Sequence, residues 1–152
     1  MKSIVFASKA HAGQVRKYTG EPYITHPLAV AEMVADYMVG DEWTTQERDI
    51  AIDCAVLHDV VEDTDVTIED IEREFGKERA KGVWFLSDPP NFVGNRKLRK
   101  KLTRDRLKLA PAYIKLVKSF DIKHNADSIK KYDPKFYVVF EKETTELLKY
   151  IA

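Results

Sequence analysis

The residues most able to carry chemistry form a short acidic run that begins with a histidine, His58-Asp59-Val60-Val61-Glu62-Asp63. In a continuous helix, where successive residues turn by about 100°, the imidazole and the three carboxylates of this run fall on one arc. Groups of this kind desolvate one another, and the carboxylates repel, unless a cation or the solvent relieves them. The run therefore predicts a metal site if the arc faces inward, or a solvated acidic helix end if it faces outward.

A later stripe also mixes apolar and polar side chains at helical spacing. Its members recur every three or four residues: Ile114, Val117, Asp121, Asn125 and Ser128. A core-facing stripe carries an acid, an amide and a hydroxyl only where those groups have partners. We therefore expect this stripe to face a site, although a helix that turns toward solvent halfway along would show the same pattern.

A histidine nearer the N-terminus completes the candidate ligand set. His26 directly precedes Pro27 at the start of an apolar helix, where a lone histidine is more often a capping or packed residue than a ligand. Together the three segments supply two imidazoles and two carboxylates, from His26, His58, Asp59 and Asp121. Mixed nitrogen and oxygen donors suit Mn²⁺, Fe²⁺ or Zn²⁺ better than Ca²⁺ or an all-sulfur zinc site.

The elements that must position these residues are all helical. Apolar periodicity and end signals predict helices over 3–12, 25–40, 44–63, 67–76, 77–87, 95–109, 112–130 and 134–150. Thr25 and Asp133 are the expected caps of two of them, each with a proline in the first turn. No strand pattern competes with the helical periodicity. We expect one all-α domain, a helical bundle of about seven to eight helices over residues 1–152.

Two capping boxes mark further helix starts. Thr44-x-x-Glu47 and Thr67-x-x-Asp70 each place an acidic residue three positions after a threonine, which allows reciprocal side-chain to backbone hydrogen bonds. Gly76 is the expected end of the second of these helices, because glycine is favoured just past a helix C-terminus.

Composition narrows the function classes. The 152 residues are 44% hydrophobic and 33% charged, with 25 basic and 25 acidic side chains, which excludes a strongly basic nucleic-acid coat. No apolar run approaches the ~20 residues of a membrane span. The single cysteine, Cys54, excludes an intramolecular disulfide or a Cys-rich zinc site. We expect a cytoplasmic protein that binds neither nucleic acid nor a membrane, and we predict no oligomeric state.

Basic residues are nevertheless concentrated in one stretch. It contains Arg96, Lys97, Arg99, Lys100, Lys101, Arg104, Arg106 and Lys108. Such a stretch could receive a polyphosphate, but it could equally be a solvated helix face.

Four blocks of the sequence resemble the hydrolase domain of RelA/SpoT-type alarmone enzymes, over roughly residues 4–130. They are His11-Ala-Gly-Gln-Val-Arg-Lys-Tyr-Thr-Gly-Glu-Pro-Tyr-Ile-Thr-His-Pro27, Leu57-His-Asp-Val-Val-Glu-Asp-Thr64, Asp70-Ile71 through Phe75-Gly76, and Lys118-Ser-Phe-Asp-Ile-Lys-His-Asn125. Of that family, the chain is most similar to the stand-alone small alarmone hydrolases, the metazoan SpoT homologues among them.

The resemblance implies an HD-type metal phosphohydrolase and assigns roles to ten residues. The implied ligands of one Mn²⁺ are His26, His58, Asp59 and Asp121. The implied catalytic pair, which orients and activates the attacking water, is Glu62 and Asp63. The implied nucleotide contacts are Arg16, Lys17, Asn125 and Ser128. Two positions depart from the family pattern, Phe120 in place of alanine and Ile122 in place of a basic residue, and they bear on substrate fit and rate.

The reaction implied is hydrolysis of guanosine tetra- or pentaphosphate (ppGpp or pppGpp) at the 3′-diphosphate, with release of pyrophosphate. The same metal site would serve a related phosphohydrolase, either an NADPH 2′-phosphatase or an adenine alarmone hydrolase. A helical module that senses a nucleotide or binds a protein partner without catalysis is the remaining alternative. Metal analysis of the purified protein separates such a module from an enzyme.

Overall fold

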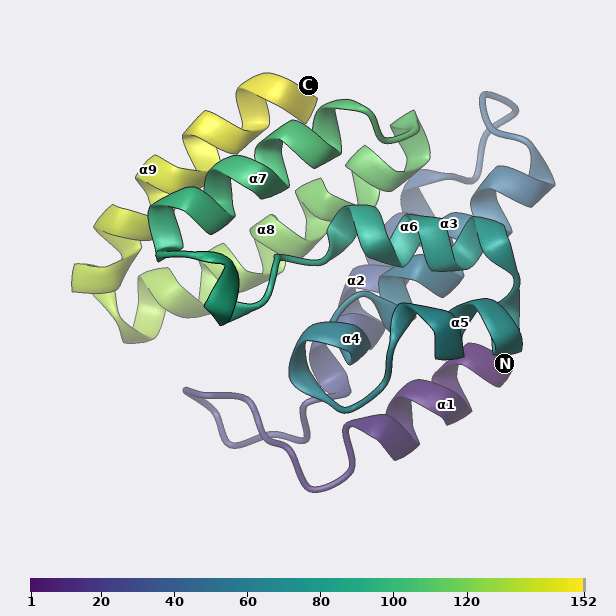
Figure 1. Ribbon diagram of the computed structural model, residues 1–152, viewed down its shortest axis with the longest axis horizontal. Coiled ribbons are helices and arrows are strands. Elements are labelled where there is room, and N and C mark those ends of the chain that lie inside the picture. The colour runs from purple at the N-terminus through teal and green to yellow at the C-terminus, as the bar shows by residue number, and fades with distance from the viewer. Residues whose placement is uncertain (152) are drawn as a thin grey trace.

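The computed structural model describes residues 1–151, and within them the chain is a bundle of helices (Figure 1). In chain order these are α1 (Lys2–Ala10), α2 (Thr25–Tyr37), α3 (Thr45–Leu57), α4 (Val60–Asp63), α5 (Ile68–Phe75), α6 (Lys77–Leu86), the 3₁₀ helix η1 (Asn91–Val93), α7 (Arg96–Lys108), α8 (Ala112–Tyr132) and α9 (Pro134–Ile151). The predicted all-α fold is confirmed. Extended backbone pairs in these residues only at an isolated bridge between Val15 and Pro22.

Helix α3 is the centre of the bundle. It packs against α1, α2, α6 and α8, and the side chains of Cys54 and Leu57 are fully buried. Figure 1 shows α7, α8 and α9 gathered on one side of the molecule, with α1 and α5 on the other. Because α8 touches α2 and α3 on one side and α9 on the other, polar side chains of α8 can be enclosed from both sides.

The predicted helix over 44–63 is interrupted at the residues that carry its chemistry. A break after Leu57 separates α3 from α4, so the described residues contain nine α-helices. In a continuing helix the Asp59 N–H would donate to the Ala55 carbonyl, but Nδ1 of the His58 ring donates to that carbonyl at 2.6 Å. The prediction of one continuous helix is therefore wrong, and a histidine–carbonyl contact occupies the break.

The predicted helix starts are confirmed except for one. Both capping boxes are formed, at Thr44 and at Thr67, and the Asp133 carboxylate accepts from the backbone amide three residues later at 3.2 Å. Thr25 is not a cap: it lies inside α2, and its hydroxyl donates to the Pro22 carbonyl at 2.8 Å. The Thr25 hydroxyl is therefore hydrogen-bonded in the turn before α2, and it does not cap the backbone amides of the helix.

Between residues 1 and 151, no helix is both long enough and apolar enough to cross a membrane. Residue 152, the last residue of the predicted domain, lies outside the described residues.

A test of the packing around α3 uses the glycine at its contact with α6. A Cβ at Gly82 would lie 2.5 Å from Cys54 Sγ and 2.9 Å from an Ile114 methyl. Overpacking of this kind costs about 1–3 kcal/mol, which exceeds the roughly 1 kcal/mol that alanine gains over glycine in a helix. We expect Gly82→Ala to lower the free energy of unfolding, measured by urea titration. Gly40→Ala, where the new Cβ meets nothing within 4 Å, is the control; an unchanged Gly82→Ala midpoint would contradict this packing.

Candidate functional site

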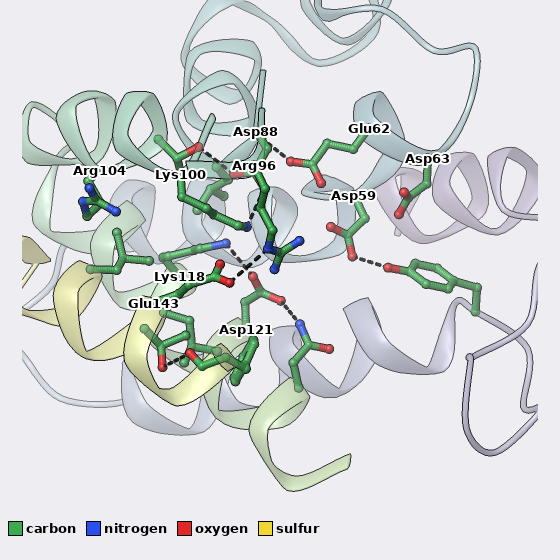
Figure 2. A pocket seen from close by; sticks show the side chains of 18 residues that line it. Asp59, Glu62, Asp63, Asp88, Arg96, Lys100, Arg104, Lys118, Asp121 and Glu143 are labelled. Atoms are coloured by element: carbon green, nitrogen blue, oxygen red, sulfur yellow. Dashed lines mark hydrogen bonds and ion pairs between the residues drawn. The ribbon is translucent and has the colours of Figure 1, made fainter. Parts of the chain in front are cut away.

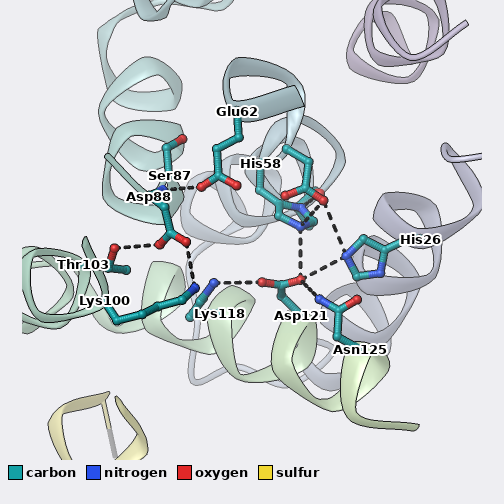
Figure 3. Close-up of polar contacts among 12 residues, drawn as sticks. His26, His58, Glu62, Ser87, Asp88, Lys100, Thr103, Lys118, Asp121 and Asn125 are labelled. Carbon is teal, nitrogen blue, oxygen red and sulfur yellow. Dashed lines mark hydrogen bonds and ion pairs between the residues drawn. The ribbon is translucent and has the colours of Figure 1, made fainter. Parts of the chain in front are cut away.

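Four side chains from three segments of the chain converge on one point, and Figure 3 labels three of them, His26, His58 and Asp121. His26 Nε2 lies 3.0 Å from Asp121 Oδ1 and 3.6 Å from Asp59 Oδ2. His58 Nε2 lies 3.1 Å from Asp59 Oδ2 and 3.3 Å from Asp121 Oδ1. Even without Asp121, the other three residues present ligand atoms within 4.8 Å of one another. The structure therefore brings together all four candidate ligands.

One nitrogen in this cluster has no hydrogen-bond partner. His58 is 1% exposed, and because its Nδ1 donates to the Ala55 carbonyl, Nε2 is the atom that carries the lone pair when the ring is neutral. This buried Nε2 makes no hydrogen bond, although two carboxylate oxygens lie close to it. A divalent cation among these atoms would satisfy the nitrogen and both carboxylates, so the residues present fit the predicted metal.

A second layer of contacts orients the candidate ligands. Asp121 Oδ2 accepts from Lys118 Nζ at 2.9 Å, and Asp121 Oδ1 accepts from Asn125 Nδ2 at 3.0 Å. The rings of His26 and His124 are hydrogen-bonded through their Nδ1 atoms at 2.7 Å, which leaves His26 Nε2 facing the cluster. Outer contacts of this kind fix the orientation and basicity of metal ligands.

The charges of the cluster favour ionised carboxylates. Burial opposes the charge on Asp121, but Lys118 and His58 outweigh burial and hold the pKa of Asp121 well below its usual value. In the same way, burial alone would lower the pKa of His58, whereas Asp59 and Asp121 raise it well above its usual value. His58 likewise lowers the pKa of Asp59 despite its burial, so both carboxylates are charged at neutral pH, as metal ligands must be. The proton that they favour on His58 in the metal-free chain would have to leave when a metal binds, because an imidazole ligand is neutral.

The two candidate catalytic carboxylates lie beside the ligands and are exposed to the adjoining pocket. One oxygen of Glu62 accepts from the Asp88 backbone amide. Partial desolvation by the surrounding protein, together with the charges of Asp59 and Asp88, raises the pKa of Glu62 to about 8. Desolvation and Asp59 also raise the pKa of Asp63. A carboxylate with a raised pKa is suited to accepting and releasing a proton.

A pocket of about 260 Å³ opens over the cluster (Figure 2). Its wall holds four basic side chains: Arg96, Lys100 and Arg104 from α7, and Lys118 from α8. Arg96 pairs with Glu143 of α9 at 3.0 Å, and Lys100 pairs with Asp88 at 2.8 Å. The basic stretch is thus divided, because part of α7 lines the pocket while residues such as Lys97 and Lys101 are exposed.

The predicted nucleotide contacts meet in a second pocket of about 270 Å³. Its lining includes all four of them, Arg16, Lys17, Asn125 and Ser128. The Arg16 guanidinium donates to Asn125 Oδ1 at 3.2 Å. Tyr23 and Asn125 line both pockets, so the two spaces adjoin at the residues that hydrogen-bond the candidate ligands Asp59 and Asp121.

The two departures from the family pattern have different surroundings. The Phe120 ring packs against the ring of Tyr37, with centroids 5.7 Å apart, and is absent from the lining of both pockets. Ile122 is buried and lines the basic pocket that also holds Arg96 and Lys100. Of the two positions, Ile122 is therefore the one placed to affect substrate fit.

Several residues that line the site are not predicted as site residues from the sequence. Lys118 has a signal in the sequence, since it precedes Asp121 by three residues and so lies on the same helix face. Asp88 stands in a proline-rich loop, and Glu143 lies in a charged helix far along the chain; nothing in their sequence surroundings indicates that they line the pocket.

Comparison with known proteins identifies relatives for the whole chain. The family model described as HD domain matches residues 3–85. A guanosine-3′,5′-bis(diphosphate) 3′-pyrophosphohydrolase of Haemophilus influenzae is 36% identical over 94% of this chain and 20% of its own length. The bifunctional (p)ppGpp synthase/hydrolase SpoT of Escherichia coli is 32% identical over 99% of this chain and 21% of its own length. The chain thus spans about a fifth of the length of these two relatives.

Solved structures extend the likeness to the fold. A structure described as a metazoan ortholog of SpoT that hydrolyses ppGpp matches with a TM-score of 0.79 and 26% identity, over 97% of this chain and 84% of that one. A protein from Listeria monocytogenes matches with a TM-score of 0.67 and 26% identity, over 89% of this chain and 83% of that one. Since the family model covers more than half of its residues, the chain belongs to the HD-domain family.

Proposed function

We propose that the chain hydrolyses ppGpp and pppGpp at the 3′-diphosphate, releasing pyrophosphate and GDP or GTP. The observation that carries this proposal is a pair of adjoining pockets with cationic side chains in both, one of which is lined by the candidate ligands Asp59 and Asp121. A nucleotide with a diphosphate at the ribose 3′ position can extend through both spaces and place its scissile phosphorus between them. The named activities of the relatives from Haemophilus and of the metazoan SpoT ortholog support the same substrate.

We propose His26, His58, Asp59 and Asp121 as the ligands of one Mn²⁺. When bound, a divalent ion lowers the pKa of a ligated water and polarises phosphoryl oxygens. The mixed nitrogen and oxygen donors suit Mn²⁺.

Glu62 and Asp63 are the proposed base and water-positioning pair. Their carboxylates face the pocket beside Asp59, where they can take the proton of the attacking water and orient its oxygen. The water oxygen bonds to the phosphorus attached to ribose O3′, the bond from that phosphorus to O3′ breaks, and O3′ takes up a proton. Pyrophosphate and a free 3′-hydroxyl result.

Two groups of basic side chains contact different parts of the proposed substrate. Arg16 and Lys17 contact the nucleoside side, with Asn125 and Ser128 along the ribose. Arg96, Lys100 and Arg104 face the diphosphate side of the pocket, where guanidinium and ammonium groups bind phosphate oxygens. A small-molecule nucleotide is thus the proposed partner. The proposed location is the cytoplasm, because it holds such nucleotides and keeps a thiol such as Cys54 reduced.

The experiment that tests this function is a hydrolysis screen in the presence of Mn²⁺. It compares ppGpp, pppGpp, an adenine analogue and NADPH, and measures pyrophosphate and phosphate separately. We expect pyrophosphate from the guanosine substrates in equal amounts with GDP or GTP. Release of phosphate from NADPH without turnover of ppGpp would contradict the proposal and favour a 2′-phosphatase.

Removal of one proposed ligand tests the metal centre. We expect His58→Ala to lose stoichiometric Mn²⁺, because it removes the nitrogen that has no other partner in the cluster. Metal content after gel filtration, measured by elemental analysis, checks this. Asp127→Asn, an exposed change on α8, should keep the metal; a His58→Ala protein that still holds one Mn²⁺ per chain would rule out this ligand set.

Neutral replacements test the catalytic pair. We expect Glu62→Gln and Asp63→Asn to keep the fold and the metal, because neither side chain is a proposed ligand, and to lose at least about 100-fold in kcat, the scale of general-base catalysis. Steady-state hydrolysis of ppGpp measures the loss. Full activity in both variants would remove the assignment of the base.

The raised pKa of Glu62 predicts a pH-dependent stability in chelator. The pKa of Glu62 is about 8 in the folded chain and near 4.5 when unfolded, so the folded state keeps the proton longer as pH rises. The stability that the folded chain gains from protonated Glu62 is therefore complete below about pH 4.5 and is lost as the pH rises toward 8. We expect Glu62→Gln to gain in melting temperature relative to wild type across this range. Glu32→Gln, at an exposed site on α2, is the control, and a pH-independent difference for Glu62→Gln would disprove the effect.

A further inference from the structure

The tyrosine at the end of the loop between α1 and α2 contacts the candidate metal centre directly. The Tyr23 hydroxyl donates to Asp59 Oδ2 at 2.7 Å. The same oxygen lies 3.1 Å from His58 Nε2 and 3.6 Å from His26 Nε2, so it is the oxygen that faces the proposed ion. A carboxylate oxygen has lone pairs for two partners, and Tyr23 uses one while leaving the other toward the cluster.

The loop that carries Tyr23 is also fixed to the catalytic side of the pocket. His11 Nδ1 donates to Gln14 Oε1 at 2.8 Å, and Gln14 Nε2 donates to the Asp63 backbone carbonyl at 2.7 Å. The rings of Tyr23 and His11 are in contact, with centroids 4.8 Å apart. Through these contacts the loop holds both the backbone of Asp63 and the carboxylate of Asp59.

The same loop presents the proposed nucleotide contacts. The Arg16 guanidinium lies 5.9 Å from the centre of the Tyr23 ring, and the Tyr23 amide donates to the Gln14 carbonyl at 2.9 Å. The Tyr23 carbonyl in turn accepts from the His26 amide at 3.1 Å. Tyr23 therefore touches the nucleotide-facing side of the loop, a metal ligand and the start of the helix that carries another ligand.

From this arrangement we infer that Tyr23 is a positioning residue of the metal centre. Its hydroxyl fixes the orientation in which Asp59 binds the ion, and its ring holds that orientation in register with Arg16. The inference about Asp59 concerns the ligand set alone, whereas the link to Arg16 rests on the proposed function. Loss of an outer contact to a metal ligand typically costs 10–100-fold in metal affinity or activity.

The test is Tyr23→Phe, which removes the hydroxyl and keeps the ring between His11 and Arg16. Metal-free protein is titrated with Mn²⁺ by calorimetry, and its folding is checked by thermal melting in chelator. We expect the dissociation constant for Mn²⁺ to rise about 10–100-fold. In ppGpp hydrolysis with Mn²⁺ in excess, we expect kcat to fall and the KM for the nucleotide to stay, because the substrate-facing groups remain.

Tyr18→Phe is the matched control within the same loop. Its hydroxyl also bonds an aspartate, Asp133, at 3.1 Å, but not a candidate ligand, so the Mn²⁺ affinity should equal that of wild type. Equal affinity in wild type and Tyr23→Phe, or an equal loss in both variants, would overturn the inference. A wild-type chain that binds Mn²⁺ without hydrolysing ppGpp would remove the proposed function and leave the calorimetric test of Tyr23 intact.

Discussion

Two carboxylates and two imidazoles lie within contact distance of one another in the protein interior. The charges of the two carboxylates must be compensated there, and the surrounding contacts serve that need. Asp59 and Asp121 approach the same nitrogen of His58. Two anions this close are tolerated in a protein interior only when cations or hydrogen bonds compensate them. Lys118 and Tyr23 supply part of that compensation, and the proposed metal ion, for which the unpartnered His58 Nε2 would be a ligand, would supply the remainder.

The fold places these groups by packing three segments that are distant in the sequence against one another. Helix α2 brings His26, the end of α3 brings His58 and Asp59, and α8 brings Asp121; α2, α3 and α8 are mutually packed. The break between α3 and α4 lets adjacent residues contribute an imidazole and a carboxylate to one point. Helices α7 and α9, which lie beyond the residues matched by the family model, then enclose the pocket above it. Three of the four candidate ligands, His26, His58 and Asp59, therefore lie within the residues matched by the family model, whereas Asp121 and the basic pocket wall are supplied by the later helices.

Much of this arrangement could be predicted from the sequence, because local signals encode it. The capping boxes at Thr44 and Thr67 depend on residues three positions apart, and the stripe through Asp121 and Asn125 depends on helical spacing alone. The helix break was not predictable in this way, since no glycine or proline marks it and the contact found there joins the His58 ring to the Ala55 carbonyl. The prediction of Thr25 as a helix cap is wrong because its hydroxyl donates instead to the Pro22 carbonyl in the preceding turn.

The pocket wall was the least predictable part, because it depends on packing between elements far apart in the chain. Glu143 meets Arg96 across 47 positions, and Asp88 meets Lys100 across a loop. Sequence spacing carries no information about such pairs, so the basic stretch could not be divided beforehand into residues that line the pocket and residues that are solvated.

The proposed chemistry depends on one ion held by four side chains. The most direct measurement is a crystal structure of the protein grown with Mn²⁺, with anomalous diffraction recorded at the manganese edge. We expect a single strong anomalous peak bounded by His26 Nε2, His58 Nε2, one oxygen of Asp59 and one oxygen of Asp121. A peak bound elsewhere, or no peak at this point in protein saturated with Mn²⁺, would contradict it.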